Sequence, residues 1–130
     1  MTLKPSLRDE LEGLRSRVSG HLLAPGDTGF DEARAVWNAM IDRRTAAIVR
    51  ASAVDDIAPT IALARERGLD LAVRGGGHNV AGNGTVEGGI VLDLGDLNAV
   101  TVDPASRTVR CRAGPRWRTS TPPLPTSRTV

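Results

Sequence analysis

The most informative stretch of this chain for its fold is Leu71-Ala-Val-Arg74-Gly75-Gly76-Gly77-His78-Asn79-Val80-Ala81-Gly82. An apolar run stops at an arginine, three glycines follow, and a histidine and an asparagine come next. Adjacent glycines adopt positive φ angles without side-chain clashes. Such a loop can therefore turn its N–H groups toward one point and form a concave nest for an anion. The sequence predicts an anionic ligand at this loop, with His78 at the rim of the nest.

The residues before this loop predict a strand–helix–strand unit. Residues 46–51 are a short β-type run, and residues 69–73 form the next strand. Between them, Ser52 and Asp55 have the spacing of a capping box. We expect a helix from there to about residue 67, ended by Gly68. The unit is βαβ-like, and its glycine-rich loop leaves the C-terminal end of a strand, where α/β sheets place their ligands.

Other segments complete an α+β pattern with an α/β-like start. The expected elements are an amphipathic helix over residues 6–19, a helical turn or two over 31–40, a strand over 88–94, and a hairpin with strands 99–103 and 108–112. The 31–40 segment would carry one apolar face, made of Ala33, Val36, Trp37 and Met40. The helix after Ser52 would turn Ile57, Ile61 and Ala64 inward, and Pro59, just past its first turn, conflicts mildly with it.

Composition is that of a soluble globular chain. It has 130 residues, 40% of them hydrophobic and 25% charged, so we expect at most one domain. Cys111 is the only cysteine, which excludes an internal disulfide and favours a reducing compartment. The first 20 residues carry no apolar signal segment, and no apolar run approaches membrane-spanning length. We expect a cytoplasmic location and no membrane partner.

The charge distribution argues against nucleic acid as a partner. Residues 1–114 hold 14 Lys+Arg and 15 Asp+Glu, a formal net charge of −1, whereas residues 115–130 hold three arginines and no acid. The basic balance thus comes wholly from the last 16 residues. The body offers no basic stripe of the kind that a phosphate backbone requires.

From about Pro25 to Gly114 the chain resembles the N-terminal part of a FAD-binding domain in FAD-linked oxidases. The family has the p-cresol methylhydroxylase / vanillyl-alcohol oxidase type of FAD domain and includes berberine-bridge-like enzymes. Eight segments in the right order carry the resemblance: residues 25–27, 34–38, 48–50, 55–57, 64–68, 74–79, 92–94 and 102–104. We expect residues 1–24 to be an N-terminal helical segment and 25–114 to be the first part of the FAD domain.

The resemblance implies a cofactor site made of Arg74, Gly75, Gly76, Gly77, His78, Asn79 and Gly82. The loop 74–79 would bind the FAD pyrophosphate through backbone N–H groups, and His78 would be joined covalently to the 8-methyl carbon of the isoalloxazine. Such a bond raises the reduction potential of the flavin, which is one means by which a protein tunes a cofactor. Gly82 would let the backbone lie close to the ring system. Thr45 stands where the family usually has proline, and we interpret it as a turn variation.

The remaining polar residues favour structural roles. Asp93 alternates with apolar residues in a strand, so we expect it to face outward or to cap a turn. His21 is expected at the surface, and Cys111 is expected to be a small half-buried strand residue. We assign no catalytic residue and no metal site.

The whole relative would be a FAD-dependent oxidoreductase, in which a small-molecule substrate gives a hydride to FAD and O2 is the acceptor. We expect the 130-residue chain to be inactive as written, because the family's substrate-acting residues lie further along. Two alternatives stay open: a stand-alone flavin- or nucleotide-binding module without catalysis, and an inert fragment that does not fold stably.

The composition changes at Gly114. Residues 115–130 hold four of the eight prolines and show no periodicity, so we expect this tail to be disordered. Family members continue with a segment like Gly-Ala-Thr-Trp-x-Asp-Val-Asp-Ala-Ala-Thr. If the codons are read one base earlier from the last base of codon 114, with G at the free wobble positions, residues 115–123 become Ala-Thr-Leu-Ala-Asp-Val-Asp-Ala-Ala. We hypothesise that one base is missing near codon 114.

This hypothesis predicts the outcome of resequencing the gene across codons 110–135 and onward. The shifted frame should read Ala-Thr-Leu-Ala-Asp-Val-Asp and stay open for several hundred codons. A shifted frame that closes at once would refute the hypothesis, and residues 115–130 would then be a genuine part of the product.

Overall fold

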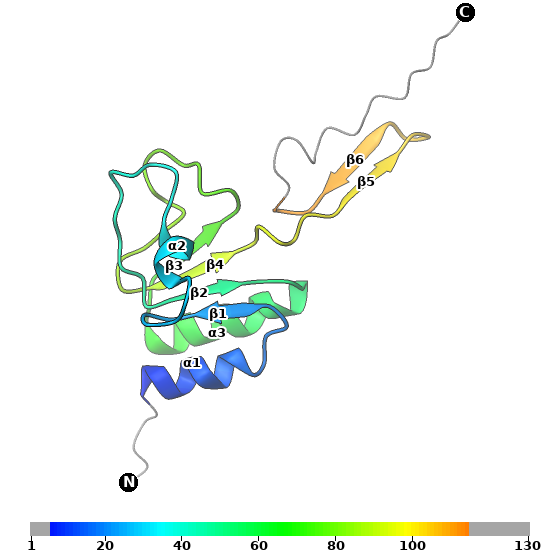
Figure 1. Cartoon of the computed structure of the whole chain (residues 1–130). Helices are drawn as coiled ribbons and strands as arrows, with labels where there is room; N and C mark the ends of the chain where they lie inside the picture. The colour runs from blue at the N-terminus through cyan, green and yellow to red at the C-terminus, as the bar shows by residue number, and fades with distance from the viewer. Residues whose placement is uncertain (1–5, 115–130) are drawn as a thin grey trace, which may run out of the picture.

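The computed structural model describes residues 6–114. Its helices are α1 (Leu7–Arg15), α2 (Phe30–Arg34) and α3 (Ile57–Arg67), and a 3₁₀ turn, η1 (Val54–Asp56), precedes α3. The strands are β1 (His21–Leu23), β2 (Ala47–Arg50), β3 (Leu71–Arg74), β4 (Ile90–Asp93), β5 (Val100–Asp103) and β6 (Thr108–Cys111). The mixed α and β content that the sequence predicts is confirmed (Figure 1).

Four strands form one sheet in the order β1-β2-β4-β3. Strands β2, β4 and β3 are parallel, and β1 pairs with β2 in the antiparallel direction. Helices α1 and α3 cover one face of the sheet, and α2 lies on the other (Figure 1). Because both faces are covered, the central strands β2 and β4 are apolar on both sides, as is usual for buried parallel strands. Strand β4 is buried along its whole length.

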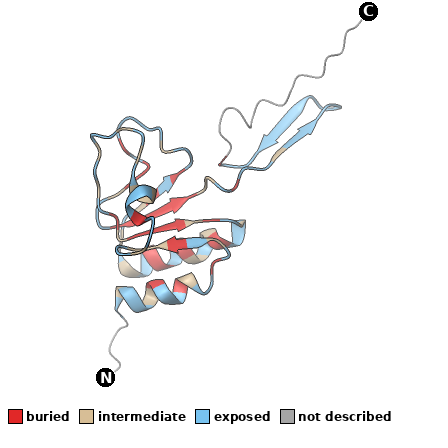
Figure 2. Ribbon diagram, in the orientation of Figure 1, coloured by how far each residue is buried: buried red, intermediate tan, exposed pale blue. Residues whose placement is uncertain are grey.

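Two apolar clusters lie on opposite faces of this sheet. The larger one packs Leu11 and Leu14 of α1 and Leu63 of α3 against the sheet. The smaller one joins Phe30 of α2 to Ile48, Ala72 and Val91. Figure 2 shows the buried residues concentrated in the sheet and on the helix faces turned toward it.

The predicted βαβ unit is present, and the structure adds one feature to it. Helix α3 connects β2 to the parallel strand β3, but these two strands are not neighbours, because β4 lies between them. The last residues of the three parallel strands are in register, with Asp93 opposite both Arg50 and Arg74. The C-terminal ends of the three strands therefore meet at one edge, where the glycine-rich loop begins.

Helix signals in the sequence are confirmed in part. Ser6 and Asp9 form a reciprocal capping box at the start of α1, and Gly68 ends α3 with a left-handed φ of 63°. The 3₁₀ turn makes α3 begin at Ile57, so Pro59 falls in the first turn, where its missing N–H leaves no bond unmade. Of the predicted inward face, Ala64 is buried and Ile57 packs against the larger apolar cluster, as expected, but Ile61 is 45% exposed. Thr60 and Leu63 turn inward as well.

The predicted capping box at the start of this helix is wrong by one residue. Asp56, not Asp55, provides the cap: its carboxylate accepts the backbone N–H groups of Ser52 and Ala53 at 2.9 and 3.1 Å. It also accepts those of Ser19 and Gly20 at 2.6 and 3.1 Å. Asp56 is 1% exposed. It therefore joins the segment before β1 to the start of α3, a contact that spacing along the chain does not reveal.

The apolar face predicted over residues 31–40 is confirmed for Ala33, which packs against the smaller cluster, and is wrong for Trp37 and Met40. Helix α2 ends at Arg34, because Ala35 is extended. Trp37 is 68% exposed and Met40 is 91% exposed. The backbone of this segment finds its partners elsewhere, as the N–H of Trp37 donates to the carbonyl of Gly77 at 3.1 Å.

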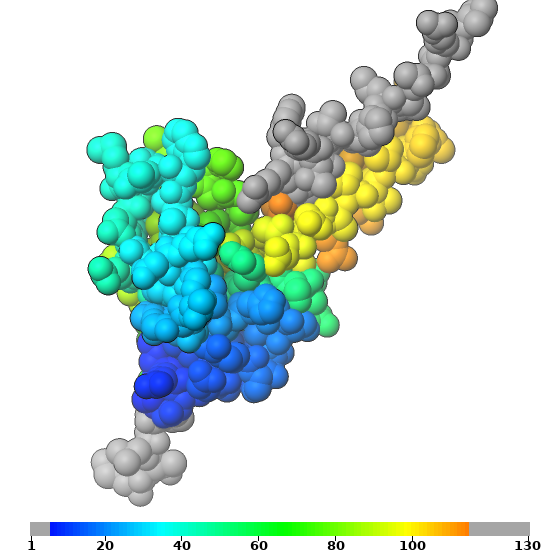
Figure 3. All heavy atoms as spheres, in the orientation of Figure 1, coloured from blue at the N-terminus to red at the C-terminus, as the bar shows by residue number. Residues whose placement is uncertain are grey.

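The hairpin of β5 and β6 is confirmed, with Val102 opposite Val109. It extends beyond the body formed by α1 to β4 (Figures 1 and 3). Cys111 is exposed rather than half-buried, because nothing in the described part of the chain covers the hairpin there. Among the described residues, no helix is long and apolar enough to cross a membrane. The predictions for residues 115–130, including the disordered tail and the missing base, lie outside the described residues.

The Asp56 cap generates a prediction about stability and pH. Burial acts to raise the pKa of Asp56, but hydrogen bonds from Ser19, Ser52, Ala53 and Gly20 outweigh it and hold the pKa below its usual value of 3.8. Since the folded-state pKa is the lower one, this contribution to stability is present above about pH 4 and is lost as the pH falls through the folded-state pKa. Asp56→Asn should lower the free energy of unfolding by about 2 kcal/mol or more at pH 7.

Urea unfolding of the wild type and Asp56→Asn, followed by circular dichroism between pH 7 and pH 2, checks this. The difference between the two proteins should shrink as the pH falls. Asp55→Asn is the matched control, because Asp55 is exposed and its side chain makes no hydrogen bond within residues 6–114. Equal losses in the two variants would contradict the role of Asp56.

Candidate functional site

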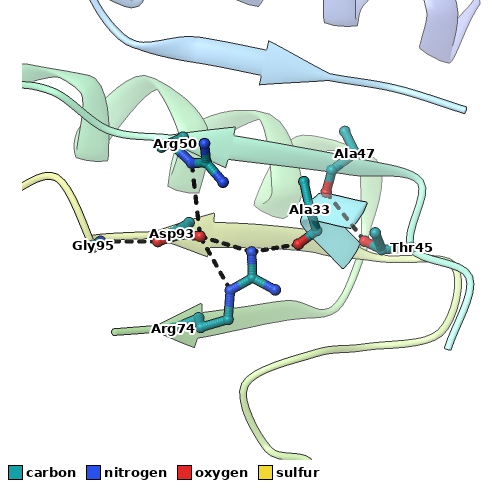
Figure 4. Close-up of polar contacts among 7 residues, drawn as sticks. All are labelled: Ala33, Thr45, Ala47, Arg50, Arg74, Asp93 and Gly95. Carbon is teal, nitrogen blue, oxygen red and sulfur yellow. Dashed lines mark hydrogen bonds and ion pairs between the residues drawn. The ribbon is translucent and has the colours of Figure 1, made fainter. Parts of the chain in front are cut away.

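The site starts at a buried ion pair at the C-terminal edge of the sheet. Arg74 ends β3 and Asp93 ends β4, and they are only 5% and 7% exposed. The Nη2 and Nε of Arg74 donate to Oδ2 of Asp93 at 2.7 and 3.2 Å. Nη2 also donates to the carbonyl of Ala33 at 2.7 Å, which ties α2 to the pair (Figure 4).

Asp93 caps a turn, which is one of the two structural roles expected for it, and it does not face outward. Its Oδ1 accepts the backbone N–H of Gly95 at 2.8 Å and caps the turn after β4. Its Oδ2 accepts Arg74 from one side, and Nε of Arg50 lies 4.0 Å away on the other (Figure 4). Two guanidinium groups therefore share one carboxylate, and the edge of the sheet keeps one net positive charge at this point.

The glycine-rich loop presents a row of backbone donors. Within residues 6–114, the N–H groups of residues 75–79 donate no hydrogen bond to the protein. Gly77 has a φ of 71°, the left-handed region that glycine adopts without strain. The loop carbonyl at Gly77 is used instead, since it accepts from Trp37. The donors of the predicted nest therefore have no protein acceptor within residues 6–114, and their convergence on one anion stays a prediction.

Arg74 adds a side-chain donor to this row. Its Nη1 is buried and has no hydrogen-bond partner among the described residues. Arg74 lines two hollows that lie against the loop. The larger, of about 690 Å³, is lined among others by Arg50, Gly75, Gly77, Asp93 and Gly114. The smaller, of about 270 Å³, is lined among others by His78, Asn79 and Asn83. A buried donor without a partner, beside a row of available N–H groups, is the arrangement that an oxyanion satisfies.

His78 lies over the backbone of the loop. It is exposed, and a Cβ placed on Gly76 would lie 2.7 Å from Cδ2 of His78. The imidazole therefore occupies the space that a Cβ at position 76 would take, and a side chain there would displace the ring from this position.

The other two predicted site residues have roles within the fold. Asn79 closes the next turn, since its Oδ1 accepts the N–H of Asn83 at 3.1 Å and its carbonyl accepts that of Gly82. Gly82 has a φ of 76°, and a Cβ there would lie 2.8 Å from Cγ2 of Ile41. Gly82 is thus explained by packing, and its approach to a ring system stays a prediction.

Sequence reasoning missed the segment that supports the loop from outside. Besides the Trp37 contact, Nδ2 of Asn38 donates to the carbonyl of Val80 at 2.8 Å. Nη1 of Arg43 donates to the carbonyls of Gly82 and Thr85 at 2.7 and 2.9 Å. These contacts join residues about 40 positions apart, and no local pattern signals them.

Thr45, expected to be a turn variation, is buried. Its hydroxyl lies 3.1 Å from the carbonyl of Ala47 (Figure 4). It also lies 2.5 Å from the carbonyl of Gly89. It joins the chain before β2 to the chain before β4.

The buried pair predicts a clear pattern of stability. Asp93→Asn removes the charge that balances Arg74 and should lower the free energy of unfolding by about 3 kcal/mol or more. The double variant Arg74→Met/Asp93→Leu removes both charges and should recover most of that loss. Urea unfolding of both variants tests this, with Asp70→Asn, an exposed carboxylate, as the control. A double variant as unstable as Asp93→Asn would show that charge compensation is not the cause.

Residues 45–121 match the family model for the FAD binding domain. The chain is 36% identical over 97 residues to (R)-6-hydroxynicotine oxidase from Paenarthrobacter nicotinovorans, a match that covers 75% of this chain and 21% of that protein. It is 33% identical over 100 residues to the FAD-linked oxidoreductase YvdP of Bacillus subtilis, covering 76% of this chain and 22% of that one.

Solved structures agree. The crystal structure of 6-hydroxy-D-nicotine oxidase from Arthrobacter nicotinovorans matches with a TM-score of 0.73 at 36% identity, over 75% of this chain and 22% of that one. Xylooligosaccharide oxidase from Myceliophthora thermophila has the same fold, with a TM-score of 0.73 at 23% identity, over 87% of this chain and 24% of that one. The chain thus spans about a fifth of the length of the curated relatives it matches. It belongs to the FAD binding domain family, and the described residues form an N-terminal portion of that domain.

Proposed function

We propose that this chain binds FAD as the first part of the flavin domain of an FAD-linked oxidoreductase, with the diphosphate of FAD held at residues 75–79. The observation that carries the proposal is the row of backbone N–H groups without an acceptor within residues 6–114, beside the buried Nη1 of Arg74. This donor set fits the diphosphate, because charge-assisted bonds to phosphate oxygens would satisfy Nη1 of Arg74, which has no hydrogen-bond partner among the described residues. The described residues thus fit the cofactor of the family.

The cofactor contacts divide between backbone and side chains. Gly75, Gly76 and Gly77 would offer N–H groups with no side chain in the way of a ligand. Asp93 fixes the position of Arg74 through their hydrogen bond. Asn79 would keep the far end of the loop closed through its bond to Asn83. A cofactor seated here would meet preformed donors, which limits the ordering that binding requires.

We further propose that His78 is the residue joined covalently to the 8-methyl carbon of the isoalloxazine. Support comes from its exposure and from the position of its ring over Gly76, at the rim of the smaller hollow. An imidazole nitrogen there would be an accessible nucleophile. The new bond would replace a C–H bond of the 8-methyl group, with loss of one methyl proton and of the imidazole N–H proton. The electron pair would reduce the flavin, and O2 would reoxidise it. Gly76 is then a positioning residue, since a methyl group at that position would displace the ring.

Bound FAD would supply the chemistry of accepting a hydride from a substrate. O2 is the proposed oxidant that returns the reduced flavin to its oxidised form. We assign no residue of this chain a role in acting on the substrate. Flavin binding, rather than turnover, is therefore the function proposed for the 130-residue chain. A cytoplasmic location stays a prediction from its single cysteine.

Flavin retention after denaturation tests these assignments. The chain is produced with FAD, precipitated in acid, and run on a denaturing gel viewed under ultraviolet light. The wild type should keep its fluorescence, and His78→Ala should lose all of it while still binding FAD reversibly. Gly76→Ala should bind FAD but retain far less flavin in the gel. Gly13→Ala is the control, because a Cβ at position 13 meets nothing within 4 Å.

Each outcome bears on one proposal. A wild type that binds no flavin would overturn the proposed function. Flavin that is bound but wholly released by acid would refute only the covalent bond to His78. Full retention in Gly76→Ala would refute the positioning role of Gly76.

A further inference from the structure

Arg50, the last residue of β2, lines the larger cavity of about 690 Å³. Among residues 6–114 it has no close hydrogen-bonded or ion-pair partner. Its guanidinium makes no hydrogen bond within residues 6–114, and its one ion pair is the 4.0 Å contact with Asp93. The side chain is 38% exposed, so it can move within the cavity.

Asp93 binds Arg74 firmly and Arg50 only weakly. The Oδ2 atom already accepts two hydrogen bonds from Arg74, at 2.7 and 3.2 Å, and Oδ1 accepts the N–H of Gly95. Arg15, a further cation in the cavity wall, is bound to Asp27 at 2.7 Å. The cavity wall also carries Glu32 and Asp96, but neither forms an ion pair with Arg50 within the described part of the chain. The charge of Arg50 is therefore left without close compensation.

The sheet places this charge opposite the glycine-rich loop. Arg50 and Arg74 lie on either side of Asp93 in register, one strand away from it in each direction. Neighbouring strands are about 4.8 Å apart, so the backbones of the two arginines are about 10 Å apart. A ligand that meets the N–H groups of residues 75–79 in this cavity has Arg50 across from it (Figure 4 shows Arg50 and Arg74 on the two sides of Asp93).

We propose that Arg50 is a second anion ligand of the site, which binds a phosphate oxygen of the cofactor from the side of the cavity opposite the loop. A guanidinium offers several donors in one plane, which suits a phosphate group better than a weak, shared contact with a carboxylate. The proposal rests on the proposed function, and it adds a residue outside the glycine-rich motif to the recognition of the diphosphate.

Binding measurements with and without phosphate test the proposal. The full chain and its Arg50→Gln and Arg50→Lys variants are titrated by calorimetry with three ligands. These are FAD, ADP, which carries the diphosphate and adenosine without the flavin, and riboflavin, which carries no phosphate. Arg50→Gln should weaken FAD and ADP by about tenfold and leave riboflavin unchanged, while Arg50→Lys should fall between. The affinity for ADP should also depend less on salt in Arg50→Gln than in the wild type.

Arg65→Gln is the matched control, because Arg65 is an exposed arginine of α3 whose side chain forms no ion pair within residues 6–114. Circular dichroism verifies that each variant is folded. ADP binding by Arg50→Gln equal to that of the wild type would overturn the proposal, as would an equal loss for riboflavin. A wild type that binds neither FAD nor ADP would overturn the proposed function itself, which distinguishes the two failures.

Discussion

The structure depends on the ion pair between Arg74 and Asp93. A charged pair that is more than nine-tenths buried stays in place only if its geometry is good and its remaining donors and acceptors are satisfied. Here one carboxylate oxygen takes the guanidinium and the other caps the turn after β4, while a second bond from Arg74 reaches α2. The pair thus fixes the ends of two strands, one helix and the first residue of the glycine-rich loop. Nη1 of Arg74 is the one part of it that the described protein leaves unsatisfied.

The loop beyond this pair combines a rigid start with a surface free of side chains. Three glycines expose the backbone to a ligand, but a glycine run by itself is flexible and would lose much conformational entropy on binding. The neighbouring segment limits that loss, because Trp37, Asn38 and Arg43 bond to carbonyls of the loop and its continuation. Those bonds use carbonyl groups and leave the N–H groups available. A loop whose carbonyl groups are bonded to the protein and whose N–H groups are available is suited to binding an anion.

Family membership and the geometry support different parts of the functional conclusion. The match to the FAD binding domain family identifies the cofactor class. The relatives named for 6-hydroxynicotine and xylooligosaccharide oxidation show that one domain architecture serves several oxidases. The geometry adds what the family name does not contain: the placement of His78 over Gly76, and a weakly paired Arg50 in the cavity wall.

The local elements of this protein follow from the amino-acid sequence alone. The strand before and after α3, the glycine that ends this helix, the hairpin and the glycine-rich loop all follow from spacing within a few residues, where propensity and turn chemistry act. The resemblance to a flavoprotein family also came from local motifs in order along the chain.

The contacts between residues that are distant in the sequence come from the tertiary structure. Asp93 lies 19 positions from Arg74, and Asp56 lies 37 from Ser19, so no periodicity could pair them. Strand β4 enters between two strands that the chain connects directly, and this insertion buries Asp93, which alternation suggested would face water. Trp37 lies beyond the end of α2 and is exposed, and its N–H donates to the carbonyl of Gly77 in the loop, where local pattern had favoured a longer helix. Propensity and turn chemistry over a few residues produce the helices, strands and turns. Burial and hydrogen bonds between distant residues assemble the site.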